Sequence, residues 1–146
     1  MASKNVETLR AAHESWNKRD FAGVVKNAAE DLVYTDNARA VTLNGRDKFR
    51  EWTEEWAEAF SDGLITNPEY IDAGDIVVAR FTVVGTNDGP FGSMKPTGRK
   101  MSLPFCEICH FDCGVEVDLQ RLGGLDFCGR ILTYTSHQDC CLHARQ

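Results

Sequence analysis

One carboxylate stands among apolar residues in the segment best suited to chemistry. Glu107 lies in the run LPFCEIC, residues 103–109. The alternation of an extended strand places Glu107 on the same face as Phe105 and Cys109. A carboxylate with apolar neighbours loses hydration, so its pKa should rise, which suits general acid–base catalysis near neutral pH. We therefore predict that Glu107 is a catalytic candidate in a pocket lined by Phe105 and Cys109. The alternative is an exposed or salt-bridged glutamate at a sheet edge.

Aromatic residues at helical spacing form a second group of candidates. Trp52, Trp56 and Phe60 share one face of a predicted helix. Such a stripe is more often hydrophobic core than ligand platform, and both interpretations stay open at this point. His13, on the inner face of an earlier helix, is either a hydrogen-bonded core histidine or a pocket acid or base. The candidate pocket residues outside the Glu107 segment are His13, Trp16, Tyr34, Trp52, Trp56 and Phe60.

The elements that must position these residues are helices followed mainly by strands. Apolar residues from Val6 to Trp16 recur every three or four positions, which predicts a first helix that Ser3 caps. Helices grouped before a mostly antiparallel curved sheet make an α+β fold. The length of 146 residues favours a single domain over residues 1–146. The further predicted elements are helices over 21–29 and 46–60 and strands over 31–36, 67–71, 75–84, 100–111 and 115–122.

Several short motifs occur in a family-typical order. The matching pieces are Gly85-Thr86, Gly89, Pro96-Thr97-Gly98-Arg99 and Glu107-x-x-x-Phe111-Asp112, with weaker matches at Trp16-Asn17-x-Arg19-Asp20 and Gly45-Arg46. The chain resembles the SnoaL-like polyketide cyclase and ester cyclase group of the nuclear transport factor 2-like superfamily over about residues 5–112. The resemblance implies a cone-shaped fold with helices packed in a curved sheet, a central pocket, and a homodimer formed through the outer face of the sheet.

The end of the chain departs from that family. The resemblance implies a catalytic aspartate on the last strand, about fourteen residues after Glu107, but Arg121 stands there. The nearest carboxylate is Asp118, the second catalytic candidate, which shares with Glu116 the opposite face of a regular strand. This departure argues against ordinary cyclase activity. The tail over 113–146 is rich in cysteine and histidine and is either a diverged natural ending or the result of a change of reading frame.

Composition limits the partners. The net charge of −6 with scattered basic residues argues against nucleic acid. No apolar run approaches the 18 residues of a membrane span, and the beginning of the chain lacks an apolar signal core, so a cytoplasmic protein is expected. All six cysteines lie after residue 105. Without an export signal they are expected to be free thiols, because their spacing suits a zinc site poorly. No metal and no cofactor are expected.

Three functions fit these features. The first is cofactor-free acid–base chemistry of the cyclase or isomerase type, which needs at least two polar groups converging in an apolar pocket. The second is binding of a small apolar ligand, carbonyl-bearing or aromatic, without turnover. The third is a non-catalytic protein-interaction or structural domain of the same fold, with a filled pocket. The missing aspartate moves the prediction from the first function toward the second.

Overall fold

The computed structural model describes residues 2–122. The expectations for the tail beyond residue 122, including those for its cysteines and histidines, lie outside the described residues. The helices are α1 (Lys4–Asn17), α2 (Phe21–Val24) and α3 (Arg46–Ala59). The strands are β1 (Ala28–Asp36), β2 (Val41–Asn44), β3 (Leu64–Ala73), β4 (Ile76–Thr86), β5 (Lys100–Asp112) and β6 (Val115–Leu122).

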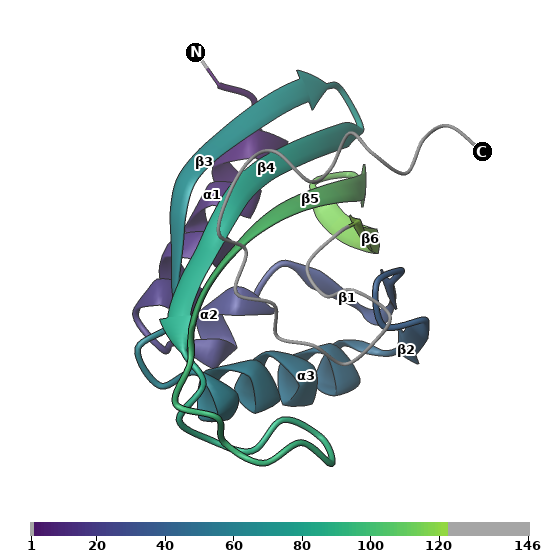
Figure 1. Ribbon diagram of the computed structural model, residues 1–146. Helices are drawn as coiled ribbons and strands as arrows, with labels where there is room; N and C mark the ends of the chain where they lie inside the picture. Colours follow the sequence, from purple (N-terminus) through teal and green to yellow (C-terminus); the bar gives the residue numbers. More distant parts are fainter. Residues whose placement is uncertain (1, 123–146) are drawn as a thin grey trace, which may run out of the picture.

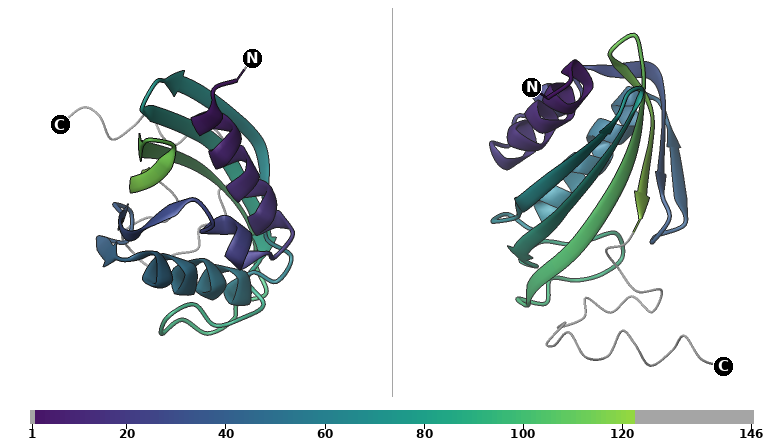
Figure 2. Two further views of the ribbon diagram at one scale, coloured as in Figure 1. Left: turned by 180° about the vertical axis from the view of Figure 1, so that it is seen from behind. Right: turned by 90° about the horizontal axis from the view of Figure 1, so that it is seen from above.

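The six strands form one strongly bent sheet in the order β2-β1-β6-β5-β4-β3. All neighbouring pairs are antiparallel except β1 and β6, which run parallel. The long strands β3, β4 and β5 curve together, and α1 and α3 lie on their concave side (Figures 1 and 2). This is the predicted α+β cone of the nuclear transport factor 2-like type, and it leaves an interior between helices and sheet.

Two helices line that interior with apolar and aromatic side chains. In α1 the buried residues are Val6, Leu9, His13 and Trp16, and the Ser3 hydroxyl accepts a hydrogen bond from the Val6 amide as the predicted cap. In α3 the buried residues are Phe49, Trp52, Thr53, Trp56 and Ala59. The helical spacing read from the sequence therefore places both aromatic stripes on the face that packs against the sheet.

The second helix is shorter than predicted. It ends at Val24 rather than continuing to Ala29, because Ala28 already belongs to β1 and pairs with Glu116 of β6. Long-range strand pairing therefore outweighs the local apolar spacing of residues 21–29. The short strand β2, which pairs with the end of β1, was not predicted.

The connection between β4 and β5 is fastened to the end of α3 by a buried amide. The Asn87 side chain donates hydrogen bonds to the carbonyl oxygens of Ala59 and Gly89 and accepts one from the Thr97 amide. Phe91 in the same connection packs against Trp56, with ring centroids 4.6 Å apart. The β4–β5 connection thus holds Phe91 against Trp56 on one side of the interior.

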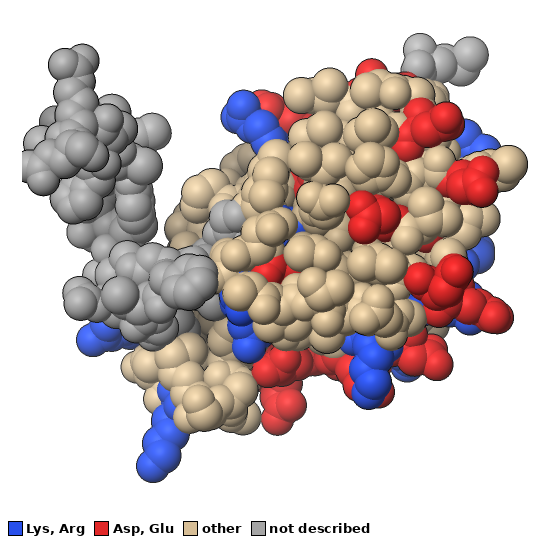
Figure 3. All heavy atoms as spheres, turned by 90° about the vertical axis from the view of Figure 1, so that its right-hand side faces the viewer, with Lys and Arg blue, Asp and Glu red and all other residues tan. Residues whose placement is uncertain are grey.

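The outer surface carries mixed charge. On the face shown in Figure 3, acidic and basic side chains are interspersed around a broad uncharged area. Among residues 2–122, no helix is both long enough and apolar enough to span a bilayer.

Candidate functional site

A tight hairpin with an irregular pairing joins the two strands that carry the polar residues of the interior. Cys113 and Gly114 both have positive φ, 49° and 83°, as the common two-residue hairpin turn requires. His110 pairs with Asp118, but Phe111 pairs with Glu116, so Val117 is an extra residue in β6. Such a bulge shifts the inward and outward alternation of a strand. Glu116, Leu119 and Arg121 consequently all face the interior.

The interior contains a cavity between α1, α3 and the concave face of the sheet. Its volume is about 50 Å³, which is room for a few water molecules and well below the roughly 300–1,000 Å³ of pockets for drug-sized ligands. Aromatic side chains therefore fill much of the space. All three tryptophans of the chain line the cavity, and its polar lining consists of His13, Thr53, Glu107, Glu116 and Arg121.

A buried ion pair lies on the sheet wall of this cavity. Glu107 and Arg121 are direct cross-strand partners. Nε and Nη2 of Arg121 donate to Oε1 of Glu107 at 3.0 and 2.7 Å. The Glu107 residue is only 3% exposed. Charge-assisted hydrogen bonds of this length are among the stronger polar contacts in proteins, so the pair joins β5 and β6 at the polar centre of the cavity.

The environment of Glu107 lowers the pKa of its carboxyl, whereas its apolar sequence neighbours predicted a raised pKa. Burial alone raises the pKa of a carboxyl, and a raised value was predicted. The Arg121 charge, together with hydrogen bonds from His13 and Arg121, outweighs burial and lowers the pKa of Glu107 to about 2. The predicted raised pKa is therefore wrong, and Glu107 is an ionised acceptor rather than a proton donor near neutral pH.

His13 connects the ion pair to Tyr70 through hydrogen bonds. Its Nε2 lies 3.2 Å from Oε2 of Glu107, and its Nδ1 lies 2.9 Å from the Tyr70 hydroxyl. Because ionised Glu107 can only accept, Nε2 of His13 must carry the hydrogen. In the neutral ring, Nδ1 then accepts from the Tyr70 hydroxyl. Both Oε atoms of Glu107 are thus occupied, one by Arg121 and one by His13.

Aromatic rings surround the Arg121 guanidinium. Its Cζ lies 5.0 Å from the ring centre of Phe105, 5.6 Å from that of Tyr34 and 6.0 Å from that of Trp56. Burial disfavours the charge, but the negative groups near Arg121, which include Glu107, raise its pKa above the ordinary value. Nε1 of Trp56 is buried without a hydrogen-bond partner among residues 2–122. The Arg121 end of the cavity therefore offers a fixed cation and an unused N–H donor.

Glu116 is a second buried carboxyl on the same wall of the cavity. It was not among the candidate site residues predicted from the sequence. It is 5% exposed, and its Oε1 has no hydrogen-bond partner in the part of the chain that the structure describes. Burial is the largest influence and raises the pKa of Glu116 to about 8, with the charges of Glu107 and Asp118 adding to the shift. The alternation of β6 gave no sign of this inward position, because the bulge at Val117 creates it.

The structure separates the predicted site residues into three groups. His13, Trp16, Trp52, Trp56 and Glu107 line the cavity. Tyr34, Phe60, Phe105 and Cys109 are buried but do not line it, although Tyr34 and Phe105 pack around Arg121. Asp118 lies on the outer face of β6, where its carboxylate accepts a hydrogen bond from the Gln120 amide at 3.3 Å. The catalytic role suggested for Asp118 therefore lacks a geometric basis.

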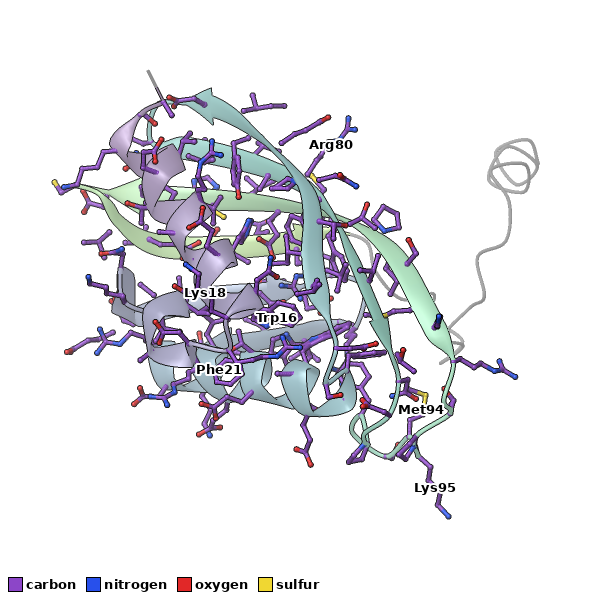
Figure 4. All side chains as sticks on the ribbon, turned by 90° about the vertical axis from the view of Figure 1, so that its left-hand side faces the viewer. Trp16, Lys18, Phe21, Arg80, Met94 and Lys95 are labelled. Carbon is purple, nitrogen blue, oxygen red and sulfur yellow. The ribbon has the colours of Figure 1, made fainter. Side chains whose placement is uncertain are left out.

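The Arg80 side chain of β4 lies away from this site. Figure 4 shows Arg80 on the outer side of the sheet and Trp16 projecting from α1 toward the interior. Arg80 pairs with Glu69 at 3.5 Å, and both side chains are largely exposed. Within residues 2–122, no three side chains of His, Cys, Asp or Glu are grouped so that they could hold a metal ion.

Comparisons with known proteins agree with this architecture. Residues 6–115 match the model of the family described as SnoaL-like polyketide cyclase. A search among curated proteins finds no match.

Many solved structures share the fold. One named as a SnoaL-like polyketide cyclase from Jannaschia sp. CCS1 has a TM-score of 0.76 at 18% identity, covering 82% of this chain and 85% of its own. One named as a polyketide cyclase from Pseudomonas putida KT2440 has a TM-score of 0.75 at 19% identity, covering 85% and 94%. AclR from Streptomyces galilaeus has a TM-score of 0.72 at 22% identity, covering 82% and 88%. At these identities the likeness establishes the fold alone.

Removing one partner of the buried ion pair should strongly destabilise the protein. Glu107→Gln leaves the buried Arg121 guanidinium without its counter-charge, a change that typically costs about 3–5 kcal/mol of unfolding free energy. The matched control is Glu69→Gln, which breaks the exposed pair with Arg80 and should cost less than about 1 kcal/mol. Urea unfolding of both variants measures the difference. Equal, small losses would show that the Glu107–Arg121 pair is not structurally important.

Proposed function

Because the chain belongs to the SnoaL-like polyketide cyclase family, we propose that it is a small-molecule pocket protein. Its ligand is a small apolar compound with a carbonyl group or an aromatic ring, bound between α1, α3 and the concave face of the sheet. The observation that carries this proposal is an apolar, aromatic cavity into which His13, Glu107, Glu116 and Arg121 converge. Such a combination of apolar walls and a few placed polar groups is typical of ligand sites.

The ligand's carbonyl oxygen would bind at the Arg121 end. Nη1 of Arg121 makes no hydrogen bond to any described residue, since the contacts to Glu107 use Nε and Nη2. Nε1 of Trp56 is also unused within the described residues. A buried donor without a partner is costly, so an acceptor oxygen on a ligand would be favoured there. The aromatic rings of Trp16, Trp52 and Trp56 would contact the apolar part of the ligand.

Cyclase turnover would be weak or absent. Proton abstraction next to a carbonyl needs a base, and Arg121 occupies the position where the family resemblance implies an aspartate. Glu107 is a poor substitute, because a carboxylate with a pKa of about 2 binds a proton weakly. We also propose that the pocket supports weak cofactor-free acid–base chemistry of the cyclase or isomerase type. The support for this chemistry is that more than one polar group faces the cavity.

One observation favours a different function. The protein's own side chains fill most of the interior and leave a cavity of only about 50 Å³, as expected for a non-catalytic interaction or structural domain. Ligand entry therefore requires movement of aromatic side chains, and the binding experiment below separates the two functions.

Ligand binding can be followed by tryptophan fluorescence, because all three tryptophans line the cavity. Acetophenone, a one-ring ketone, should change the emission in a saturable way. Ala12→Phe should weaken binding at least tenfold, because Ala12 lines the cavity and the larger ring fills it. The control is Ala11→Phe, which adds the same ring at an exposed position of α1 and should leave affinity unchanged.

The same samples decide between the remaining functions. Saturable binding that disappears in Ala12→Phe, together with little turnover of an aromatic polyketide ester, is the expected result. No binding of acetophenone or of other small ketones and aromatics would favour the interaction domain. Robust turnover that survives Glu107→Gln would contradict both the binding function and the part given to Glu107.

We also propose that the protein is cytoplasmic and that it forms a homodimer through the outer face of the sheet. On that face Ile71, Val78 and Ile108 pair across β3, β4 and β5, and Ile71 is 58% exposed. An apolar row of this kind is suited to burial against a second copy. Sedimentation velocity should show a dimer at micromolar concentration, whereas a monomer at all accessible concentrations would reject this contact.

A further inference from the structure

The unused carboxyl oxygen of Glu116 requires an explanation beyond the fold. Buried polar atoms in native proteins are nearly always hydrogen-bonded, so an orphaned one indicates a missing partner. Oε1 of Glu116 is such an atom among residues 2–122, and the Glu116 side chain lines the cavity. Neither the Glu107–Arg121 ion pair nor the hydrogen bonds of His13 involve Oε1 of Glu116. A group that enters the cavity could therefore complete its hydrogen bonding.

Glu116 lies at a different place on the cavity wall from the ion pair. Arg121 pairs with Glu107, whereas Glu116 pairs with Phe111, four residues further along β5. At about 3.3 Å per residue, the two positions are roughly 13 Å apart along the strand. The Glu116 side chain reaches from there to the Cys109 thiol, two residues from Glu107 on the same face of β5. The cavity wall therefore carries two separate polar groups, the Glu107–Arg121 pair and the Glu116 carboxyl.

Burial, reinforced by nearby negative charges, raises the pKa of the Glu116 carboxyl and keeps it protonated at neutral pH. Burial and the charges of Glu107 and Asp118 raise the pKa of Glu116 to about 8, although its contact with the Cys109 thiol acts in the other direction. The pKa of the Cys109 thiol is itself raised, by burial first and by Glu116 and Glu107 next. The titratable or charged groups that face Glu116 across the cavity and along the sheet are His13 of α1, Glu107 and Cys109 of β5, and Arg121 of β6. Asp118, on the outer face of β6, acts through its charge alone. The cavity-lining residues of α3 and β4 carry no charge.

We propose that the Glu116 carboxyl is a second ligand-binding group of the cavity and donates a hydrogen bond to an oxygen atom of a neutral ligand. This rests on the proposed function, because the other end of the same ligand binds near Arg121 and Trp56. The ligand class is then narrower: a ring-sized, uncharged molecule with two acceptor oxygens, one for each polar group of the wall. A cationic ligand fits the site less well, because Arg121 already places a positive charge in the cavity.

A pair of matched ketones tests the second contact. 1,4-Diacetylbenzene has carbonyl groups at both ends of the ring, and 4-isopropylacetophenone has a similar outline with one carbonyl. Neither compound titrates in the working range. At pH 6 the wild-type protein should bind the diketone about three to ten times more tightly, as expected for one additional hydrogen bond. At pH 9, where Glu116 has lost its proton, this preference should disappear.

Two substitutions assign the effect to Glu116. Glu116→Gln keeps an N–H donor that does not titrate, so the preference for the diketone should persist at both pH values. Glu116→Leu removes the donor, so both ketones should bind equally at both pH values. Circular dichroism checks that each variant is folded, and calorimetry measures the dissociation constants.

The failure of this inference differs from the failure of the proposed function. Equal binding of the two ketones by the wild-type protein at pH 6, or a preference that persists in Glu116→Leu, would overturn the role of Glu116 while leaving the pocket function intact. A preference that increases from pH 6 to pH 9 would also overturn it. If neither ketone binds, the pocket function and this inference fail together.

Discussion

The ion pair between Glu107 and Arg121 is the interaction on which the interior of this protein depends. Two charges buried beneath aromatic rings are tolerated only when each compensates the other and the remaining lone pairs are occupied. Here Arg121 and His13 occupy both oxygens of Glu107, and Tyr70 in turn is within hydrogen-bonding distance of His13. These polar groups therefore hold one another in place, and they connect α1 to β5 and β6.

The replacement of an expected aspartate by Arg121 changes the chemistry of the site. Two facing carboxylates would repel each other and share a proton, which suits acid–base work. A carboxylate facing a guanidinium instead gives two groups that hold their charge across the neutral range. The cavity wall therefore carries a fixed dipole rather than a pair of carboxyls that could share a proton. Glu116, moved inward by the bulge at Val117, is left as the carboxyl with a pKa near neutrality.

The sequence was sufficient for the parts of the structure that follow from regular periodicity. Helical spacing placed His13, Trp16, Trp52 and Trp56 on inner faces, and strand alternation did the same for Glu107. It was insufficient where long-range pairing decided the outcome. The pairing of Ala28 with β6 shortened α2, and the bulge turned Glu116 inward while Asp118 kept its expected place on the outer face. The lowered pKa of Glu107 could not be inferred from its apolar sequence neighbours, because its partner Arg121 is fourteen residues away.

One wall of the cavity carries two carboxyls with opposite protonation states at neutral pH. Carbon-13 NMR titration of the glutamate side-chain carboxyls, assigned with Glu107→Gln and Glu116→Gln, measures this directly. We expect Glu107 to stay ionised down to about pH 3 and Glu116 to titrate near pH 8, consistent with pKa values of about 2 and about 8. Titration of Glu107 above its ordinary value of 4.5, or a Glu116 that is already ionised at pH 6, would contradict these protonation states.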